Sequence, residues 1–153
     1  MRRIAIPAAL VFAGALALSG CAAGDGGDTA GSADACTTVA SEVRDVSNGV
    51  QNTLAAPESV DELEAYLEDA KSRVDAAIEE AGDDEELAAA VEDFKATLEG
   101  VSEYAGELTE GPSEEDPEAT TVEQDPDALA EQQAAVQEAA TEVTSACAAD
   151  EEE

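Results

Sequence analysis

The stretch that decides the fold is residues 59–108, SVDELEAYLEDAKSRVDAAIEEAGDDEELAAAVEDFKATLEGVSEYAGEL. Apolar side chains recur in it at alternating intervals of three and four residues, the spacing of one face of an α-helix. This pattern predicts two helices, over about 60–81 and 84–108, with a stop at Gly82 between them. Because the connection is very short, we expect the two helices to be antiparallel neighbours.

Capping residues stand where both helices should begin. Ser59 with Glu62 forms a capping box, and Asp83 with Glu86 forms an acidic analogue of it. The apolar positions of each helix would form its buried face. They are Val60, Leu63, Leu67, Ala70, Val74, Ala77 and Ala81, followed by Leu87, Val91, Phe94, Leu98, Val101, Ala105 and Leu108.

The same alternation continues upstream. It predicts a helix over about 35–54, with Asp34 or Ser32 as its N-cap. Asn48-Gly49 is its weak point, and an end of the helix at Gly49 remains an alternative. The buried face would be Cys36, Val39, Val43, Val46 and Val50.

Downstream, Asp125 as N-cap and Pro126 at the first helical position predict a fourth helix over about 126–148. Gln133 falls on its core side, and we expect it to mark an edge or specificity position rather than a ligand. The buried face would be Leu129, Gln133, Val136, Ala140, Val143 and Cys147.

Together these patterns predict an all-α fold, a small antiparallel four-helix bundle of up-down-up-down topology over residues 35–149. Residues 109–124 are acidic and contain glycine and proline, so we expect an irregular loop there. Residues 21–34 read as a flexible tether and residues 150–153 as an acidic tail.

Two cysteines support this topology. Cys36 lies at the start of the first predicted helix and Cys147 at the end of the fourth, and these points meet at one end of an up-down-up-down bundle. We therefore predict a disulfide between them, which suits an exported protein. Two separate thiols, or a cross-link between molecules, are the alternatives.

Composition suggests a different reading. Val, Leu, Ile and Phe make up 20 of the 133 residues after Gly20, and so small a share in a highly charged chain is typical of disorder. These residues hold 38 acids and 4 bases, a formal charge of −34. A largely disordered polyanionic tether is thus the competing hypothesis. The agreement of caps, apolar stripes and cysteine positions favours the bundle.

The first 21 residues carry a separate signal. Basic residues at Arg2 and Arg3 precede an apolar run over 4–18, which is short for a membrane-spanning helix, and Leu18-Ser19-Gly20-Cys21 follows. This order resembles the signal peptide and lipobox of bacterial lipoproteins, of the small type found in high-GC Gram-positive organisms.

The resemblance implies removal of residues 1–20 by cleavage between Gly20 and Cys21. It also implies a diacylglyceryl group on the Cys21 sulfur, with acyl chains of the palmitate kind, and a location on the outer face of the cell membrane. Two chains or more make a stable anchor. An ordinary secretory signal with an incidental cysteine, or a signal anchor, is the alternative.

The composition also argues against several functions. The chain has no His, so His-based catalysis and His–metal sites are excluded. Its negative charge opposes binding to nucleic acid. The predicted core faces contain no acid, so no carboxylate pair is placed for catalysis. Six acids between residues 114 and 125 lack the spacing of a calcium loop. We expect no enzyme activity, no cofactor and no specific metal site.

The remaining hypotheses concern binding. The first is a lipid-anchored, non-enzymatic interaction module that offers an acidic helical surface to a protein or cationic partner. The second is buffering of Ca²⁺ or of cationic peptides at the cell surface. The sequence does not settle the oligomeric state, although a monomer is favoured.

Overall fold

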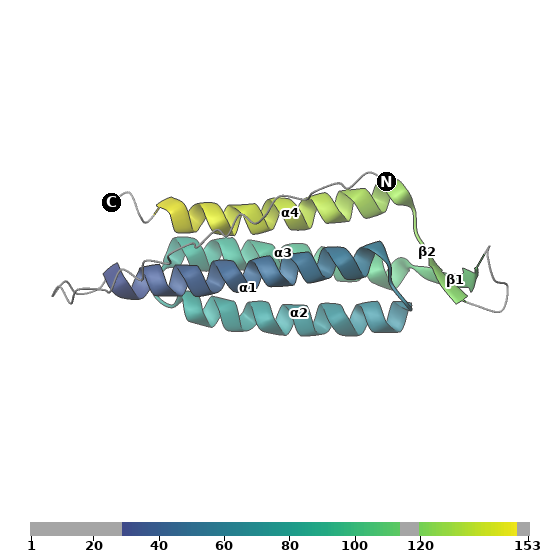
Figure 1. Cartoon of the computed structure of the whole chain (residues 1–153), viewed down its shortest axis with the longest axis horizontal. Helices are drawn as coiled ribbons and strands as arrows, with labels where there is room; N and C mark the ends of the chain where they lie inside the picture. The colour runs from purple at the N-terminus through teal and green to yellow at the C-terminus, as the bar shows by residue number, and fades with distance from the viewer. Residues whose placement is uncertain (1–28, 114–119, 150–153) are drawn as a thin grey trace, which may run out of the picture.

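The computed structural model describes residues 29–113 and 120–149. Four helices lie side by side along the long axis, and a β-hairpin projects beyond one end of them (Figure 1). The elements are α1 (Thr29–Ala55), α2 (Val60–Ala81), α3 (Glu85–Glu107), β1 (Thr109–Pro112), β2 (Thr120–Glu123) and α4 (Pro126–Ala149). The predicted four-helix bundle is confirmed.

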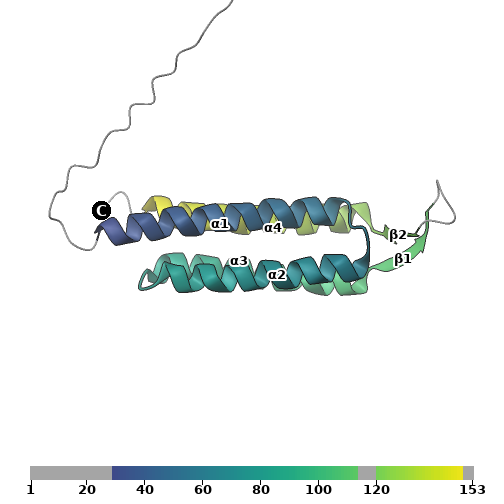
Figure 2. The same cartoon turned by 60° about the horizontal axis from the view of Figure 1, so that its bottom comes forward.

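The helices pack in a ring, in which α1 contacts α2 and α4, while α3 contacts α2 and α4. Successive helices run in opposite directions (Figures 1 and 2). The up-down-up-down topology therefore places the start of α1 and the end of α4 at one end of the bundle. The hairpin lies at the other end, beyond the end of α3 and the start of α4.

The core consists of the predicted stripes, with changes at their ends. Val60, Leu108, Leu129 and Gln133 are half-buried, whereas Leu54 is fully buried. In α4 the deepest small side chains are those of Ala139 and Ala146, while Ala140 and Cys147, each one position further along, are half-buried. The buried positions that contact one another are Cys36, Val39, Val43, Val46, Val50, Leu54, Leu63, Leu67, Ala70, Val74, Ala77, Ala81, Leu87, Val91, Phe94, Leu98, Val101, Ala105, Val136, Ala139, Val143 and Ala146. A core this continuous excludes the disordered alternative for these residues.

Helix α1 differs from its prediction at its start. It begins at Thr29, so the predicted tether over 21–34 is wrong from that residue onward. Asp34 and Ser32 lie inside the helix and are not its N-cap, and the Asp34 carbonyl accepts a hydrogen bond from Thr38 Oγ1 at 3.0 Å. Small residues such as Ala30 and Ala33 propagate a helix at little cost once the apolar stripe holds the following turns.

Helix α1 also runs unbroken through Gly49, so the alternative of an earlier end is wrong. The Tyr66 hydroxyl of α2 occupies the space that a side chain at position 49 would need. The glycine therefore allows close approach between two helices and does not end one. Its cost in helix propensity, about 1 kcal/mol, is offset by packing on either side.

The N-caps follow the sequence closely, with one shift. The Ser59 side chain accepts a hydrogen bond from the Glu62 N–H of α2, and Asp125 Oδ1 accepts from the N–H groups of Asp127 and Ala128 in α4. For α3 the cap is Asp84, whose Oδ1 accepts from Leu87 N–H at 2.9 Å, and not Asp83. Two adjacent aspartates both suit a cap, and the turn at Gly82, with φ 61°, selects the second.

The prediction of an irregular loop over 109–124 is wrong at both ends. Thr109–Pro112 pairs with Thr120–Glu123 as an antiparallel hairpin, with Thr109 opposite Glu123 and Pro112 opposite Thr120. Each strand has four residues, too few for an apolar alternation to be visible in the sequence. The β-branched run Thr120-Thr121-Val122 was the available signal for a strand.

The predicted signal peptide over 1–20, the lipid-bearing Cys21 and the tail over 150–153 lie outside the described residues. The same is true of the acids between 114 and 119.

Candidate functional site

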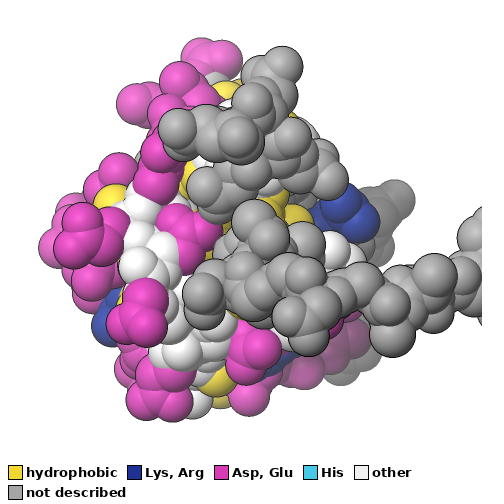
Figure 3. Space-filling model, turned by 90° about the vertical axis from the view of Figure 1, so that its left-hand side faces the viewer, with side chains coloured by type: hydrophobic (Ala, Val, Ile, Leu, Met, Phe, Trp, Pro, Cys, Tyr) yellow, Lys and Arg dark blue, Asp and Glu magenta, His cyan; other side chains and the backbone are white. Residues whose placement is uncertain are grey.

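The surface of the bundle is its most distinctive chemical feature. Of the described acids, all are exposed except Glu42 and Asp84, which are half-buried, and none lies in the core. The buried polar residue of the described chain is Ser47, whose Oγ accepts a hydrogen bond from Gln51 Nε2. Figure 3 shows acidic side chains around much of one end of the molecule, with few basic ones among them. The carboxylates therefore meet solvent or a partner.

Two bases tie neighbouring helices together. Arg73 Nε of α2 donates to Glu42 Oε1 of α1 at 2.6 Å, and Lys95 Nζ of α3 lies 2.5 Å from Asp75 Oδ1 of α2. These hydrogen bonds raise the pKa of Arg73 and of Lys95 above their ordinary values. Because both pairs are partly exposed, solvent screens them and each contributes little to the free energy of unfolding. They neutralise two of the acids but leave the great majority unpaired.

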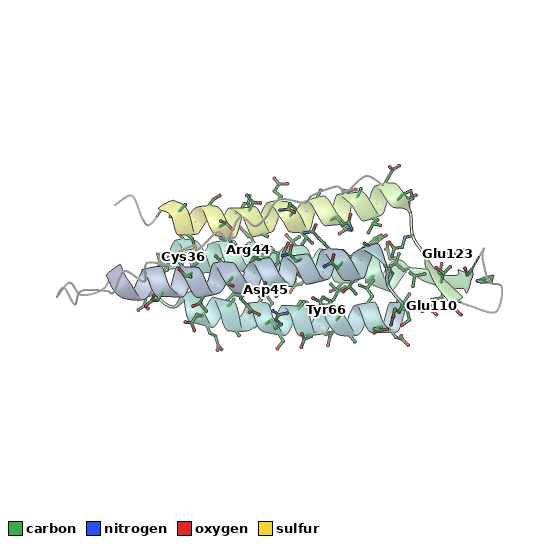
Figure 4. The ribbon with its side chains drawn as sticks, viewed as in Figure 1. Cys36, Arg44, Asp45, Tyr66, Glu110 and Glu123 are labelled. Carbon is green, nitrogen blue, oxygen red and sulfur yellow. A yellow bond between two sulfur atoms is a disulfide. The ribbon has the colours of Figure 1, made fainter. Side chains whose placement is uncertain are left out.

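The other two described bases are less constrained. Lys71 lies 3.8 Å from Glu68 within α2, a pairing between residues three apart on one helix. Arg44 is exposed on α1 beside Asp45, and Figure 4 shows both. So few bases cannot balance the field of the acids, and the surface attracts cations.

The predicted disulfide is present. Cys36 in α1 and Cys147 in α4 are bonded, with their Cα atoms 5.5 Å apart and a sequence separation of 111. The bond closes the end of the bundle where α1 begins and α4 ends. It holds the end of α4 against the start of α1.

The opposite end is held by side-chain amides. Gln124 Nε2 donates to the Leu54 carbonyl at 3.1 Å, and Gln133 Nε2 donates to the Gln51 carbonyl at 3.4 Å. The first bond satisfies a carbonyl in the last turn of α1, where a helix lacks internal partners, and the second adds a contact one turn earlier. The edge role predicted for Gln133 agrees with this contact, whereas nothing in the sequence singled out Gln124.

The hairpin is attached to the bundle by a carboxylate. Glu110 Oε1 of β1 accepts a hydrogen bond from the Val60 N–H of α2 at 2.8 Å. A negative charge is favourable at that position because the first turn of a helix exposes N–H groups and the positive end of its dipole. Figure 4 shows Glu110 and Glu123 on the hairpin, at the opposite end from Cys36.

Both tyrosines are half-buried packing residues, as the sequence indicated. The Tyr104 hydroxyl of α3 is buried without a hydrogen-bond partner, as is Gln124 Oε1. Burial raises the pKa of Tyr104, and the nearby Asp125 carboxylate raises it further. A phenol in this state stays protonated at neutral pH and acts as packing, not as a base.

The described residues hold no group of three or more acidic, cysteine or histidine side chains arranged to bind a metal ion. Of the six acids considered for calcium, Glu123 and Asp125 are described, and both are exposed. Glu123 accepts a hydrogen bond from Thr109 Oγ1 at 3.3 Å, and Asp125 caps α4. In the part of the chain that the structure describes, no helix is long and apolar enough to span a membrane.

No protein-family model, curated protein or solved structure matches the chain. The function therefore has to be argued from the residues themselves.

Proposed function

We propose that the protein is a lipid-anchored extracytoplasmic lipoprotein that acts as a non-enzymatic binding module. Its acidic helical surface would be offered to a protein or to a cationic partner. The observation that carries this proposal is the separation of the chain into an apolar core without acids and an exterior of mostly unpaired carboxylates. The reactive and ligand-binding groups of the described residues therefore lie on the surface, and most of them are carboxylates.

The direction of the bundle supports the same proposal. An anchor at Cys21 would reach the bundle through the start of α1, which lies at the disulfide end. A helix of 27 residues is about 40 Å long, so the hairpin would stand about that far from the anchored end. The surface of all four helices would then be accessible outside the membrane.

The lipid anchor is tested by comparing two single substitutions, one at Cys21 and one at Cys147. We expect mass spectrometry of the membrane-bound protein to find residues 1–20 removed and a lipid mass on Cys21, and Cys21→Ser to lose both. Cys147→Ser is the matched control, because it removes a sulfur atom from the bundle while leaving the lipid acceptor in place, and it should keep both. A membrane-bound parent protein that retains residues 1–20 and carries no lipid would replace the lipid anchor with a signal anchor.

The acidic surface is tested by its response to salt. We expect decalysine to bind the detergent-solubilised protein in about 20 mM NaCl and to lose at least tenfold in affinity in about 500 mM NaCl, where the Debye length is only a few ångströms. Decaglutamate is the control and should not bind. Binding that is unchanged by salt would contradict a role for charge.

A further inference from the structure

A groove lies between α1 and α2, in the half of the bundle nearer the disulfide, and has a volume of about 260 Å³. Its apolar lining comes from Val39 of α1 and from Ala76 and Ala77 of α2. Val39 and Ala77 belong to the core, whereas Ala76 is exposed at the edge. Between Arg73 and Glu80, α2 offers the groove only the methyl groups of Ala76 and Ala77. A larger side chain at position 76 would fill it.

Charged groups flank this apolar surface. At one side the Glu42–Arg73 pair joins the two helices, and the two charges neutralise each other. At the other side stands Glu80, which is exposed and has no ion-pair partner among the described residues. Positions 73 and 80 are two helical turns apart, about 10 Å along α2. The groove thus combines an apolar floor with one unneutralised carboxylate.

This combination selects the chemistry of a ligand. An anion would be repelled both by Glu80 and by the overall charge of −32. A bare metal ion would find one carboxylate and methyl groups, which is too few oxygen ligands. A chain with an apolar side chain next to a basic one can cover the floor and pair with Glu80. About 10 Å of groove accommodates three extended residues.

We propose that the groove between α1 and α2 binds a short basic–apolar peptide segment. An aliphatic side chain would lie on the exposed methyl group of Ala76, above the buried Val39 and Ala77, and an adjacent Lys or Arg would pair with Glu80. The argument for this occupant is complementarity of charge and of apolar surface. The inference rests on the proposed binding function and deepens it, because it assigns the cationic partner a place and an apolar requirement.

The test uses two peptides that differ only in the apolar residue. Acetyl-Lys-Leu-Lys-amide and acetyl-Lys-Gly-Lys-amide carry the same charge, and each is titrated into the full-length ¹⁵N-labelled protein in non-ionic detergent. We expect the leucine peptide to bind about tenfold more tightly, since part of the leucine surface is removed from water. Amide shifts should concentrate at residues 38–42 and 73–80.

Two pairs of variants locate the effect. Ala76→Leu fills the groove from an exposed position and should abolish the preference for the leucine peptide, whereas Ala65→Leu, exposed on the same helix outside the groove, should preserve it. Glu80→Gln should weaken binding several-fold more than Glu138→Gln, an equal change of charge on the exposed face of α4.

The outcomes separate this inference from the proposed function. Equal, salt-sensitive binding of both peptides would overturn the groove and leave the acidic surface as a diffuse attractor of cations. No binding of either peptide would overturn the groove, and failure of decalysine as well would remove the cationic partner. A leucine preference that survives Ala76→Leu would also overturn the groove.

Discussion

The two ends of the bundle are held by different means. At the end where α1 begins, the core narrows to side chains such as Ala81, Ala146 and Cys36, and a covalent bond to Cys147 joins the first helix to the last. At the hairpin end the core contains Leu54 and Leu63, and side-chain amides and a carboxylate bind the ends of helices.

The comparison also shows where each end is vulnerable. Small side chains of α2 at the disulfide end leave the groove between α1 and α2, so this end combines a covalent link with a local gap in the packing. The hairpin end depends on many weak contacts, including the close approach of Tyr66 to Gly49. Loss of the disulfide should lower the free energy of unfolding of the whole bundle. Loss of one contact at the hairpin end should loosen only the turns around it.

The largest expected effect comes from the disulfide. In the chain-entropy model a closed loop of about 100 residues stabilises a protein by about 4.7 kcal/mol. The pair Cys36→Ser and Cys147→Ser should therefore lose about 4 kcal/mol of unfolding free energy, measured by urea denaturation. Amide exchange should accelerate most in the last turns of α4 and the first turns of α1.

Reduction of the unmodified protein is the control for this prediction, since it breaks the same bond without changing the sequence. Both forms should converge on the same urea midpoint. Unchanged exchange in α4 after substitution would show that packing, and not the disulfide, holds this helix.

An intermediate effect is expected at Gly49. A methyl group added there collides with the Tyr66 hydroxyl, so Gly49→Ala should lose about 1–2 kcal/mol despite the better helix propensity of alanine. In a Tyr66→Phe background the hydroxyl is absent, and the nearest ring atom, Cζ, lies 3.0 Å from the new carbon. The loss should then shrink, with a coupling of about 1 kcal/mol in a double-mutant cycle.

Gly100→Ala provides the matched control, because nothing lies within 4 Å of a carbon added there. It should stabilise α3 by about 0.5–1 kcal/mol through helix propensity alone. If Gly49→Ala stabilised the protein by the same amount, the close approach of α1 and α2 would not explain the glycine.

The smallest effect concerns Glu62, in the first turn of α2 at the hairpin end. A hydrogen bond with Glu58 and repulsion between the two carboxylates raise the pKa of Glu62 above its ordinary value. The folded state therefore holds the proton on Glu62 more tightly than the unfolded state does. The contribution of this carboxyl to the free energy of unfolding is full below the unfolded pKa and is lost as pH rises through the raised pKa of the folded state. Glu62→Gln should raise the melting midpoint slightly at pH 7.

The same comparison at about pH 3, where the carboxyl is protonated in both states, should show no difference from the parent protein. Glu92→Gln is the control, because the charge of Glu92 acts on the nearby base Lys95 and raises its pKa. It should give no gain at pH 7. A gain of equal size in both variants would indicate relief of overall charge and not of this pair.

Much of this architecture was readable in the sequence because it depends on local order. The period of the apolar residues, Ser59 and Asp125 as caps, and the start of α4 at Pro126 are all confirmed. The disulfide was predictable because two cysteines on apolar stripes meet at one end only in an even-numbered up-down bundle. The acidic exterior followed from stripes that contain no acid.

Other features were not readable, because they depend on residues far apart in the chain. Each strand of the hairpin is too short to be predicted from its own sequence. The hairpin forms because the end of α3 and the start of α4 hold the two strands close together. The role of Gln124 appears only when it reaches Leu54, 70 residues earlier. The shift of the α3 cap from Asp83 to Asp84 was within the reach of local rules but not resolved by them.

Periodicity, capping and charge are properties of neighbouring residues, so the helices, their order around the bundle and the sign of its surface follow from the chain's local patterns. The continuation of α1 through Gly49, the pairing of residues 109–112 with 120–123 and the groove between α1 and α2 arise from long-range packing. Each of these depends on which surfaces meet, and the distance between two helices is set by side chains from both.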